Sequence, residues 1–168
     1  MFSDCIQLSN ITPLKHWNVS SGTNFKSMFK SDSQITNIRP LENWDISKAK
    51  DLEAFFSGLI DLTDLTPVQN WNVSKCKSFK SLFNNCNKIY DLSPLKNWDV
   101  SNGTDFSYMF YSCSLINDLK PIENWDVSKG DNFVKIFSGC KSLKKGDLTL
   151  NWKLSDKKHF DSMFMVEK

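Results

Sequence analysis

The sequence predicts an α/β solenoid of the leucine-rich-repeat type, built from six 27-residue coils that each hold a short parallel strand and a short helix. Three observations lead to this fold class: tryptophan recurs at a fixed interval, the same residue types return at the same distances from it, and the prolines share one phase. The tryptophans are Trp17, Trp44, Trp71, Trp98, Trp125 and Trp152, each 27 residues after the one before. A fixed period of this size is typical of repeat proteins, whose coils bury their apolar faces only by stacking.

We number positions from the tryptophan of each coil, so that coil one contains Trp17 and coil six Trp152. Serine holds position +3 and phenylalanine position +12 in every coil, while +8 and +11 are apolar throughout. The five prolines all lie four residues before a tryptophan: Pro13, Pro40, Pro67, Pro94 and Pro121. The repeat therefore explains most of the 6 Trp, 13 Phe and 5 Pro as structural residues.

The segment from +8 to +15 has the apolar spacing of an amphipathic helix, with apolar residues at +8, +11 and +12 and, in coils two to five, at +15. Position +7 carries Asn, Asp or Ser in the first five coils, and these are favoured helix N-caps. We expect a short helix there in each coil, for example over residues 106–113.

The segment around the tryptophan changes period. In Leu95-x-x-Trp98-x-Val100 the last step has a period of two, which predicts a short strand with Trp and Val facing inward. Pro94 cannot donate to a ladder, so it would stand where pairing begins. A helical bundle is the alternative, but fixed prolines and a period-two step do not suit long helices.

Composition limits the function classes. With 168 residues, 40% of them hydrophobic, the chain fits one solenoid domain over residues 1–168. A net charge of +2 argues against a general polyanion binder, so we expect no nucleic-acid partner. No apolar run approaches 18 residues, and the first five residues lack the features of a signal peptide. The two histidines, His16 and His159, and the lack of C-x-x-C predict no metal site and no cofactor.

Residues 98–101 (Trp-Asp-Val-Ser) and 106–113, which contain Met109-Phe110 and Cys113, resemble the repeat of the BspA-type leucine-rich repeat surface proteins, W-D-x-S-x-V-x-x-M-x-x-M-F-x-x-C. The resemblance covers essentially the whole chain. It implies a curved right-handed solenoid, a location at the cell surface or outside the cell, and a role as an adhesin. The chain departs from that pattern at +6, where it lacks the usual Val, and in coil six, where Leu148 replaces the proline.

Both ends of the chain fall at the same phase of the repeat, since Met1-Phe2 matches Met163-Phe164. We expect either a piece of a longer array or ends that another chain covers, and we favour the longer array.

Four cysteines, Cys5, Cys86, Cys113 and Cys140, share position +15. We expect them to be buried thiols that act as small hydrophobes. Cys76 at +5 lies in a turn of small residues and is expected to be the accessible one.

The strand positions on either side of the tryptophan carry mainly Asn and Asp, including Asp45, Asp99 and Asp126 at +1, and the serines at +3 extend this polar face. One interpretation is a recognition surface for a protein or glycan, with Asp99 and Asp126 adjacent and suited to a cation or a basic partner. The other is structural, with amide ladders and Asx turns that satisfy the backbone.

A second candidate surface consists of residues that break the repeat. Tyr108 and Tyr111 stand where other coils carry Ser, Ala, Asn or Lys, and Leu115 and Val134 are apolar at usually polar positions. They predict an exposed amphipathic patch of the kind enriched at interfaces; scattered surface residues or contact with a neighbouring coil are the alternatives.

Lysines at +4 to +6 are expected to stack on one rim, where they would meet solvent or an acidic partner or glycosaminoglycan. They are Lys48, Lys50, Lys75, Lys77, Lys129, Lys157 and Lys158.

The function that the sequence favours is a non-catalytic module that binds a protein or glycan partner in adhesion. The alternative is a structural module that stacks end to end or docks on another domain. An enzyme is disfavoured because no catalytic triad, phosphate loop or metal cluster is recognisable.

Overall fold

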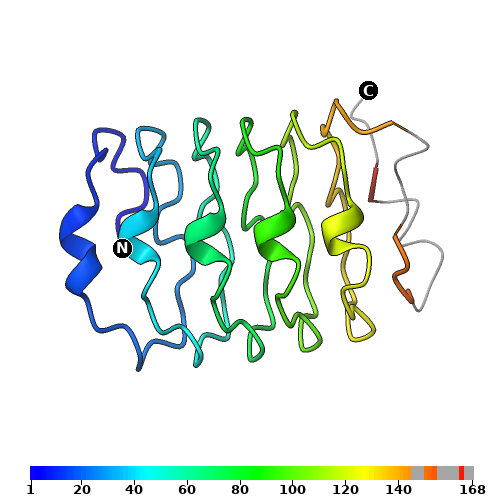
Figure 1. Cartoon of the computed structure of the whole chain (residues 1–168), viewed down its shortest axis with the longest axis horizontal. Helices are drawn as coiled ribbons and strands as arrows, with labels where there is room; N and C mark the ends of the chain where they lie inside the picture. The colour runs from blue at the N-terminus through cyan, green and yellow to red at the C-terminus, as the bar shows by residue number, and fades with distance from the viewer. Residues whose placement is uncertain (145–149, 155–162, 165–168) are drawn as a thin grey trace.

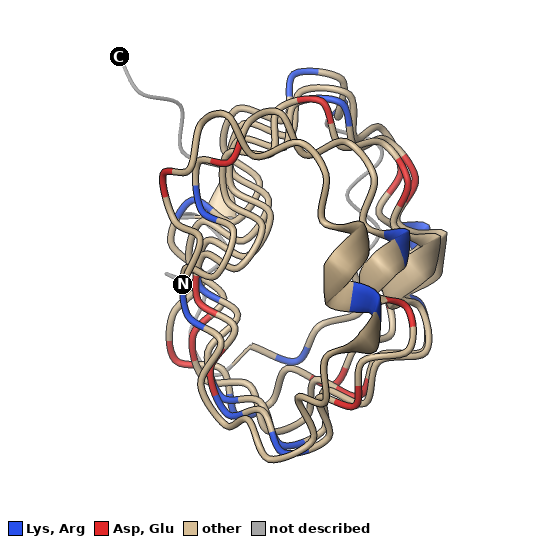
Figure 2. Cartoon of the chain, turned by 90° about the vertical axis from the view of Figure 1, so that its left-hand side faces the viewer, with Lys and Arg blue, Asp and Glu red and all other residues tan. Residues whose placement is uncertain are grey.

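The structure is a computed structural model that describes residues 1–144, 150–154 and 163–164. The coils stack side by side along the long axis of the molecule, with the N-terminus near one end (Figure 1). Viewed along that axis, successive coils superimpose as one closed outline whose interior is filled by the core side chains (Figure 2). The predicted repeat solenoid is therefore present, although its local conformations differ from those that the sequence suggested.

The helices of the described residues are short 3-10 turns that form one row (Figure 1). They are η1 (Thr12–His16), η2 (Arg39–Leu41), η3 (Thr66–Val68), η4 (Ser93–Leu95) and η5 (Lys120–Ile122). A proline stands in the first turn of each, where its fixed φ suits the helix and its missing N–H costs nothing. The prolines thus begin a helix, and the prediction that they begin a strand is wrong.

An Asn or Asp at position +20 lies two residues before the start of each of these helices. Its Oδ1 accepts a hydrogen bond from the backbone N–H two residues later, as from Thr66 to Asp64 at 2.8 Å and from Ser93 to Asp91 at 2.8 Å. These are Asx turns, which fix the entry of the chain into the proline segment.

The predicted strand at Trp-x-Val is not formed in the described coils, because that segment makes no ladder. Parallel pairing occurs at +7 instead, where bridges join Asn24, Asp51, Ser78, Asp105 and Asn132 in succession. The burial part of the prediction is correct, since Trp98 and Val100 are 4% and 2% exposed. A period-two step identifies the buried side chains, but it does not tell whether the backbone beside them is paired.

The predicted helix from +8 to +15 is also wrong, because this segment consists of two successive tight turns. In coil three the N–H groups of Leu82 and Cys86 donate to the carbonyls three residues earlier, at 3.1 Å each. Ser81 and Asn85 have φ angles of 55° and 58°, which a right-handed helix excludes. The two turns point +8, +11, +12 and +15 inward and so reproduce the apolar spacing of a helix.

Between these turns the coils are joined by a regular ladder. From +8 to +14, every second N–H donates to a carbonyl of the next coil, as from Phe79 to Asp105 at 2.8 Å and from Phe83 to Met109 at 2.9 Å. Backbone groups that tight turns leave unpaired are thereby satisfied between coils.

The core is a set of columns that run through the stack. The +12 rings form one of them, with adjacent ring centroids 5.6–6.5 Å apart. The tryptophans form another, and from Trp44 onward each indole Nε1 donates to a carbonyl 30 residues earlier at 2.9–3.2 Å. Each buried indole N–H is thus satisfied by the preceding coil.

Candidate functional site

The predicted aromatic patch lies on the two-turn segments of coils four and five. The rings of Tyr108 and Tyr111 are 5.6 Å apart between centroids and inclined by 56°. Lys135 Nζ lies 5.9 Å from the centre of the Tyr108 ring, within the range of a cation–π contact. Both tyrosines are half-buried, so each presents part of its ring to solvent.

The ladder holds Val134 next to Tyr108. The Tyr108 N–H donates to the Val134 carbonyl at 2.9 Å, and the Val134 side chain is 36% exposed. We call Tyr108, Tyr111, Val134 and Lys135 the tyrosine patch. Leu115, four residues beyond Tyr111, is 46% exposed and lies past the buried Cys113, so we do not count it in the patch.

The aspartates at +1 form Asx turns, as the structural interpretation predicts. Asp45 Oδ1 accepts from the Ser47 N–H at 3.0 Å, and Asp126 Oδ1 accepts from the Ser128 N–H at 3.0 Å. Hydrogen bonds from these serines lower the pKa of both carboxyl groups. Asp99 makes the same turn and accepts from both the N–H and the hydroxyl of Ser101.

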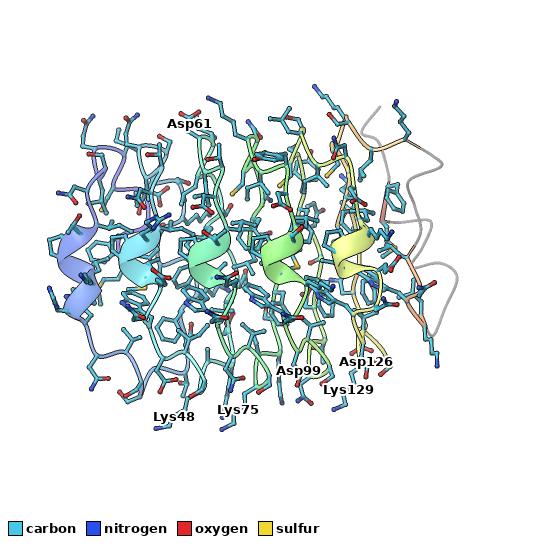
Figure 3. All side chains as sticks on the ribbon, viewed as in Figure 1. Lys48, Asp61, Lys75, Asp99, Asp126 and Lys129 are labelled. Atoms are coloured by element: carbon cyan, nitrogen blue, oxygen red, sulfur yellow. The ribbon has the colours of Figure 1, made fainter. Side chains whose placement is uncertain are left out.

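Asp99 and Asp126 nevertheless lie in the same groove. Both line an open groove of about 530 Å³ between coils four and five, together with the edges of Trp98 and Trp125. They lie on one lower edge of the stack in Figure 3. Amides and both signs of charge complete the groove through Lys96, Asn97, Asp118, Lys120, Glu123 and Asn124. The groove offers hydrogen bonds and charge to a polar ligand.

The described lysines of the predicted stripe also follow one rim: Lys48, Lys75 and Lys129 point outward along the same edge of the stack (Figure 3). Lys129 Nζ donates to Asn102 Oδ1 of the preceding coil at 2.6 Å. Lys157 and Lys158 fall outside the described residues.

The cysteines differ from expectation at two positions. Cys76 is fully buried, and burial raises the pKa of its thiol to about 12, so the prediction that it is the accessible thiol is wrong. Cys5 is the exposed cysteine. The other three thiols are buried as predicted, and each donates to a carbonyl 30 residues earlier at 3.1 Å.

Asp32 is a buried charge that the sequence reasoning missed. Its side chain is fully buried, its Oδ1 accepts from the Cys5 N–H at 2.8 Å, and its Oδ2 has no partner among the described residues. Burial raises the pKa of this carboxyl to about 6. The available signal was its position, since Asp32 occupies the +15 column that otherwise holds Cys or Leu in the first five coils.

The described residues form neither a metal-binding cluster nor a membrane-spanning helix. They contain no group of three or more His, Cys, Asp or Glu side chains placed to hold a metal ion. They also include no helix with the length and apolar character to cross a bilayer.

Comparisons with known proteins identify the sequence family. A family model described as "Mycoplasma protein of unknown function, DUF285" matches residues 1–90 and again residues 50–168. No curated protein matches the sequence. Among solved structures, a crystal structure of internalin C2 from Listeria monocytogenes is similar over 95% of this chain and 76% of its own, at 21% identity and a TM-score of 0.35. A likeness of that degree says nothing about a ligand.

Proposed function

Because the chain belongs to the DUF285 family of Mycoplasma proteins of unknown function, whose description names no activity, we propose its function from its own surface: a non-catalytic module that binds another protein through the tyrosine patch. The observation that carries this proposal is the pair of tyrosine rings in contact at positions where the fold requires no aromatic residue. Position +10 is Ser27, Ala54 and Ser81 in the first three coils, and all of them adopt the same left-handed backbone.

The composition of the patch suits a protein partner. Tyrosine supplies apolar area and a hydroxyl with little loss of side-chain entropy, and it is enriched at interfaces. Val134 adds exposed apolar surface and Lys135 a positive charge beside it. In contrast, the side-chain oxygens of the aspartates at +1 already accept hydrogen bonds from backbone N–H groups of their own coil.

The test is a binding screen on immobilised proteins and glycans, with the double variant Tyr108→Ser/Tyr111→Ser. Tyr90→Ser is the matched control, because Tyr90 is 59% exposed and lies in another coil, outside the patch. We expect a protein ligand that is lost with the double variant and kept with the control. If every ligand found is bound equally by the double variant, the patch is not the binding surface.

A second candidate function is end-to-end assembly with another copy of the chain, which an exposed coil face favours. Trp17 is 41% exposed, and its Nε1 has no hydrogen-bond partner within the described part of the chain. Sedimentation velocity over a wide concentration range tests this, with Trp17→Glu as the variant that should abolish association. A strict monomer at every concentration rules out self-stacking.

Display at the cell surface and the absence of catalysis belong to the same proposal. They are supported by the resemblance to BspA-type proteins and by the lack of a recognisable catalytic motif in the sequence. Antibody labelling of intact cells that express the native gene tests the location, and labelling only after lysis would contradict it.

A further inference from the structure

Four lysines of coils two and three form an outward-facing array. Lys48 and Lys50 at +4 and +6 are exposed while Ala49 between them is buried, and Lys75 and Lys77 repeat this around the buried Cys76. In each coil the first lysine lies in a tight turn, which the N–H of the buried residue closes by donating to the Ile46 carbonyl in coil two and the Val73 carbonyl in coil three, at 2.8 Å each. The second lysine directly follows that turn. We call Lys48, Lys50, Lys75 and Lys77 the basic array.

The stacking of the coils places the two lysine pairs beside each other. The Lys77 N–H donates to the Lys50 carbonyl at 2.9 Å, so these residues are direct neighbours across the ladder. Backbones paired in this way lie about 4.8 Å apart. Figure 3 shows Lys48 and Lys75 extending from the same edge, and Figure 2 shows basic residues gathered along that side of the outline. The four lysines thus occupy neighbouring backbone positions on one rim of the stack.

Three lysines outside the array form ion pairs across coils, whereas those of the array form none among the described residues. Lys26 and Lys80 both face Glu53, at 2.7 and 3.8 Å, and Lys88 faces Asp61 at 2.7 Å. In the described part of the chain no ion pair involves a lysine of the basic array. Stacked like charges repel one another, so an unpaired array is a cost unless an anion comes to it.

The acidic groups near the array leave it an excess of positive charge. Asp45 lies close enough to Lys48 for the ammonium to contribute to its lowered pKa, after the hydrogen bonds from Ser47. Asp51 Oδ1 at +7 accepts a hydrogen bond from the Glu53 N–H. Coil three has neutral residues, Asn72 and Ser78, at the same two positions. Asp105 of coil four is also close, since its N–H donates to the Lys77 carbonyl at 3.2 Å, and the four lysines outnumber these three carboxylates.

The surroundings of the array distinguish among polyanions. Positions +3 and +5 beside the lysines are small, and exposed aromatic rings are absent from residues 47–50 and 74–77 of the described chain. Single-stranded nucleic acids are held by aromatic platforms as well as charge, and membrane surfaces by inserted apolar side chains. A flexible chain of regularly spaced sulfates or carboxylates requires only the point charges that lysine supplies.

We propose that the basic array binds a sulfated glycan chain that lies across coils two and three. This surface is separate from the tyrosine patch, which lies on coils four and five, so the inference goes beyond the proposed function and its failure leaves that function untouched. A module with both surfaces would hold a glycan and a protein partner at the same time.

The test is binding of the full chain to heparin, as the sulfated glycan probe, at physiological ionic strength. The test variant replaces all four lysines by glutamine: Lys48→Gln, Lys50→Gln, Lys75→Gln and Lys77→Gln. The control removes the same charge elsewhere, at exposed lysines outside the array: Lys15→Gln, Lys30→Gln, Lys141→Gln and Lys153→Gln. All eight side chains are exposed, and circular dichroism checks that both variants fold.

We expect the test variant to bind heparin at least about tenfold more weakly, with a salt dependence reduced by about one unit of slope per lysine, and the control to change affinity less than about threefold. Equal losses in both variants would show attraction by net charge alone and overturn the site. Tighter binding to duplex DNA, polyglutamate or phosphatidylserine vesicles than to heparin at equal ionic strength would overturn the ligand class.

Discussion

Trp17 and Trp98 hold the same place in their coils, but their surroundings differ. Trp98 has a full coil on each side, is 4% exposed, and donates its Nε1 hydrogen to the Val68 carbonyl at 3.0 Å. Trp17 stacks on Trp44 with ring centroids 6.5 Å apart, yet it is 41% exposed. Burial in this fold is supplied by the adjacent coils, so one residue type at one position contributes differently at the edge and in the middle of the stack.

The largest expected effect follows from the phenylalanine column. Phe83 lies between Phe56 and Phe110, with ring centroids 5.7 Å from each, and is fully buried. Phe83→Ala should lower the free energy of unfolding by about 3–5 kcal/mol, because it opens a cavity in a column with no room to collapse. Phe2→Ala, at the partly exposed end of the column, should cost less than half as much. Urea unfolding measures both, and equal losses would contradict the comparison.

The second prediction concerns a close contact that coil two avoids. A Cβ on Gly103 would lie 2.4 Å from Phe106 Cζ, so Gly103→Ala should cost about 1–3 kcal/mol by overpacking. Coil two has Ala49 at this position and Leu52 in place of that ring, while Phe55 fills the space from +11.

Introducing the coil-two residues at the equivalent positions of coil four gives a control for this prediction. Adding Phe106→Leu and Met109→Phe to Gly103→Ala should recover most of the lost stability, again measured by urea unfolding. If the three changes are simply additive, the correlated residues of coil two do not compensate for one another.

The third prediction concerns the buried charge near the N-terminal edge. Asp32→Leu introduces the residue that coil two has at +15, Leu59, and should stabilise the chain by about 1–2 kcal/mol at pH 7, since it removes a buried carboxylate oxygen that has no partner. The Cys5 N–H loses Asp32 Oδ1 but keeps the Phe2 carbonyl at 3.0 Å.

The pH dependence of Asp32 has a definite sign. Burial raises its pKa from 3.8 to about 6, so the folded state binds more protons than the unfolded state between these values. Stability should therefore fall as pH rises from about 4 to about 6 and lose this contribution fully above that window. Thermal melts at a series of pH values measure the slope, and a slope that persists in the Asp32→Leu variant would assign it to another group.

The fourth prediction returns to the tryptophans. Trp98→Phe removes one of the two donors of the Val68 carbonyl, which keeps the Trp71 N–H at 3.1 Å, and should cost about 0.5–1.5 kcal/mol beyond the loss of packing. Trp17→Phe removes an indole N–H that has no partner in the described chain and should cost a few tenths of a kcal/mol. Chemical unfolding compares the two, and an equal cost would show that the cross-coil hydrogen bond contributes little.

Much of the fold was predictable, because the sequence period determines which side chains meet. The inward positions of Trp98, Val100, Phe106 and Phe110 follow from spacing alone. The conformation between them does not, since two tight turns and one short helix bury the same positions. The first turn needs left-handed backbone at Ala54, which lacks both a glycine's freedom and an Asn or Asp side chain, so no sequence signal marks it there. The second turn has such a signal at +14, where Gly58, Asn85 and Gly139 have positive φ.

The candidate sites were predicted unevenly for a related reason. The contact of Tyr108 with Tyr111 was expected from an i, i+3 spacing in a helix, and the contact exists in a turn with the same spacing. The Asx turns of Asp45 and Asp126 were foreseen because those hydrogen bonds are local. The burial of Cys76 was not, because it depends on how its turn packs against the core.

The smallest expected effect concerns the reactivity of the thiols in the native protein. It again distinguishes the edge of the stack from its middle. Cys5 and Cys113 share position +15; Cys5 is exposed, while Cys113 is fully buried and its thiol pKa is raised well above the ordinary value by burial. The thiolate is the reactive form, so Cys113 should be inert in the native state. With an aromatic disulfide reagent, one thiol should react rapidly in the native protein and the remainder only as urea unfolds it. Cys5→Ser should abolish the rapid phase. If a rapid phase survives in this variant, a buried cysteine becomes accessible without global unfolding, and the middle of the stack is less protected than its packing implies.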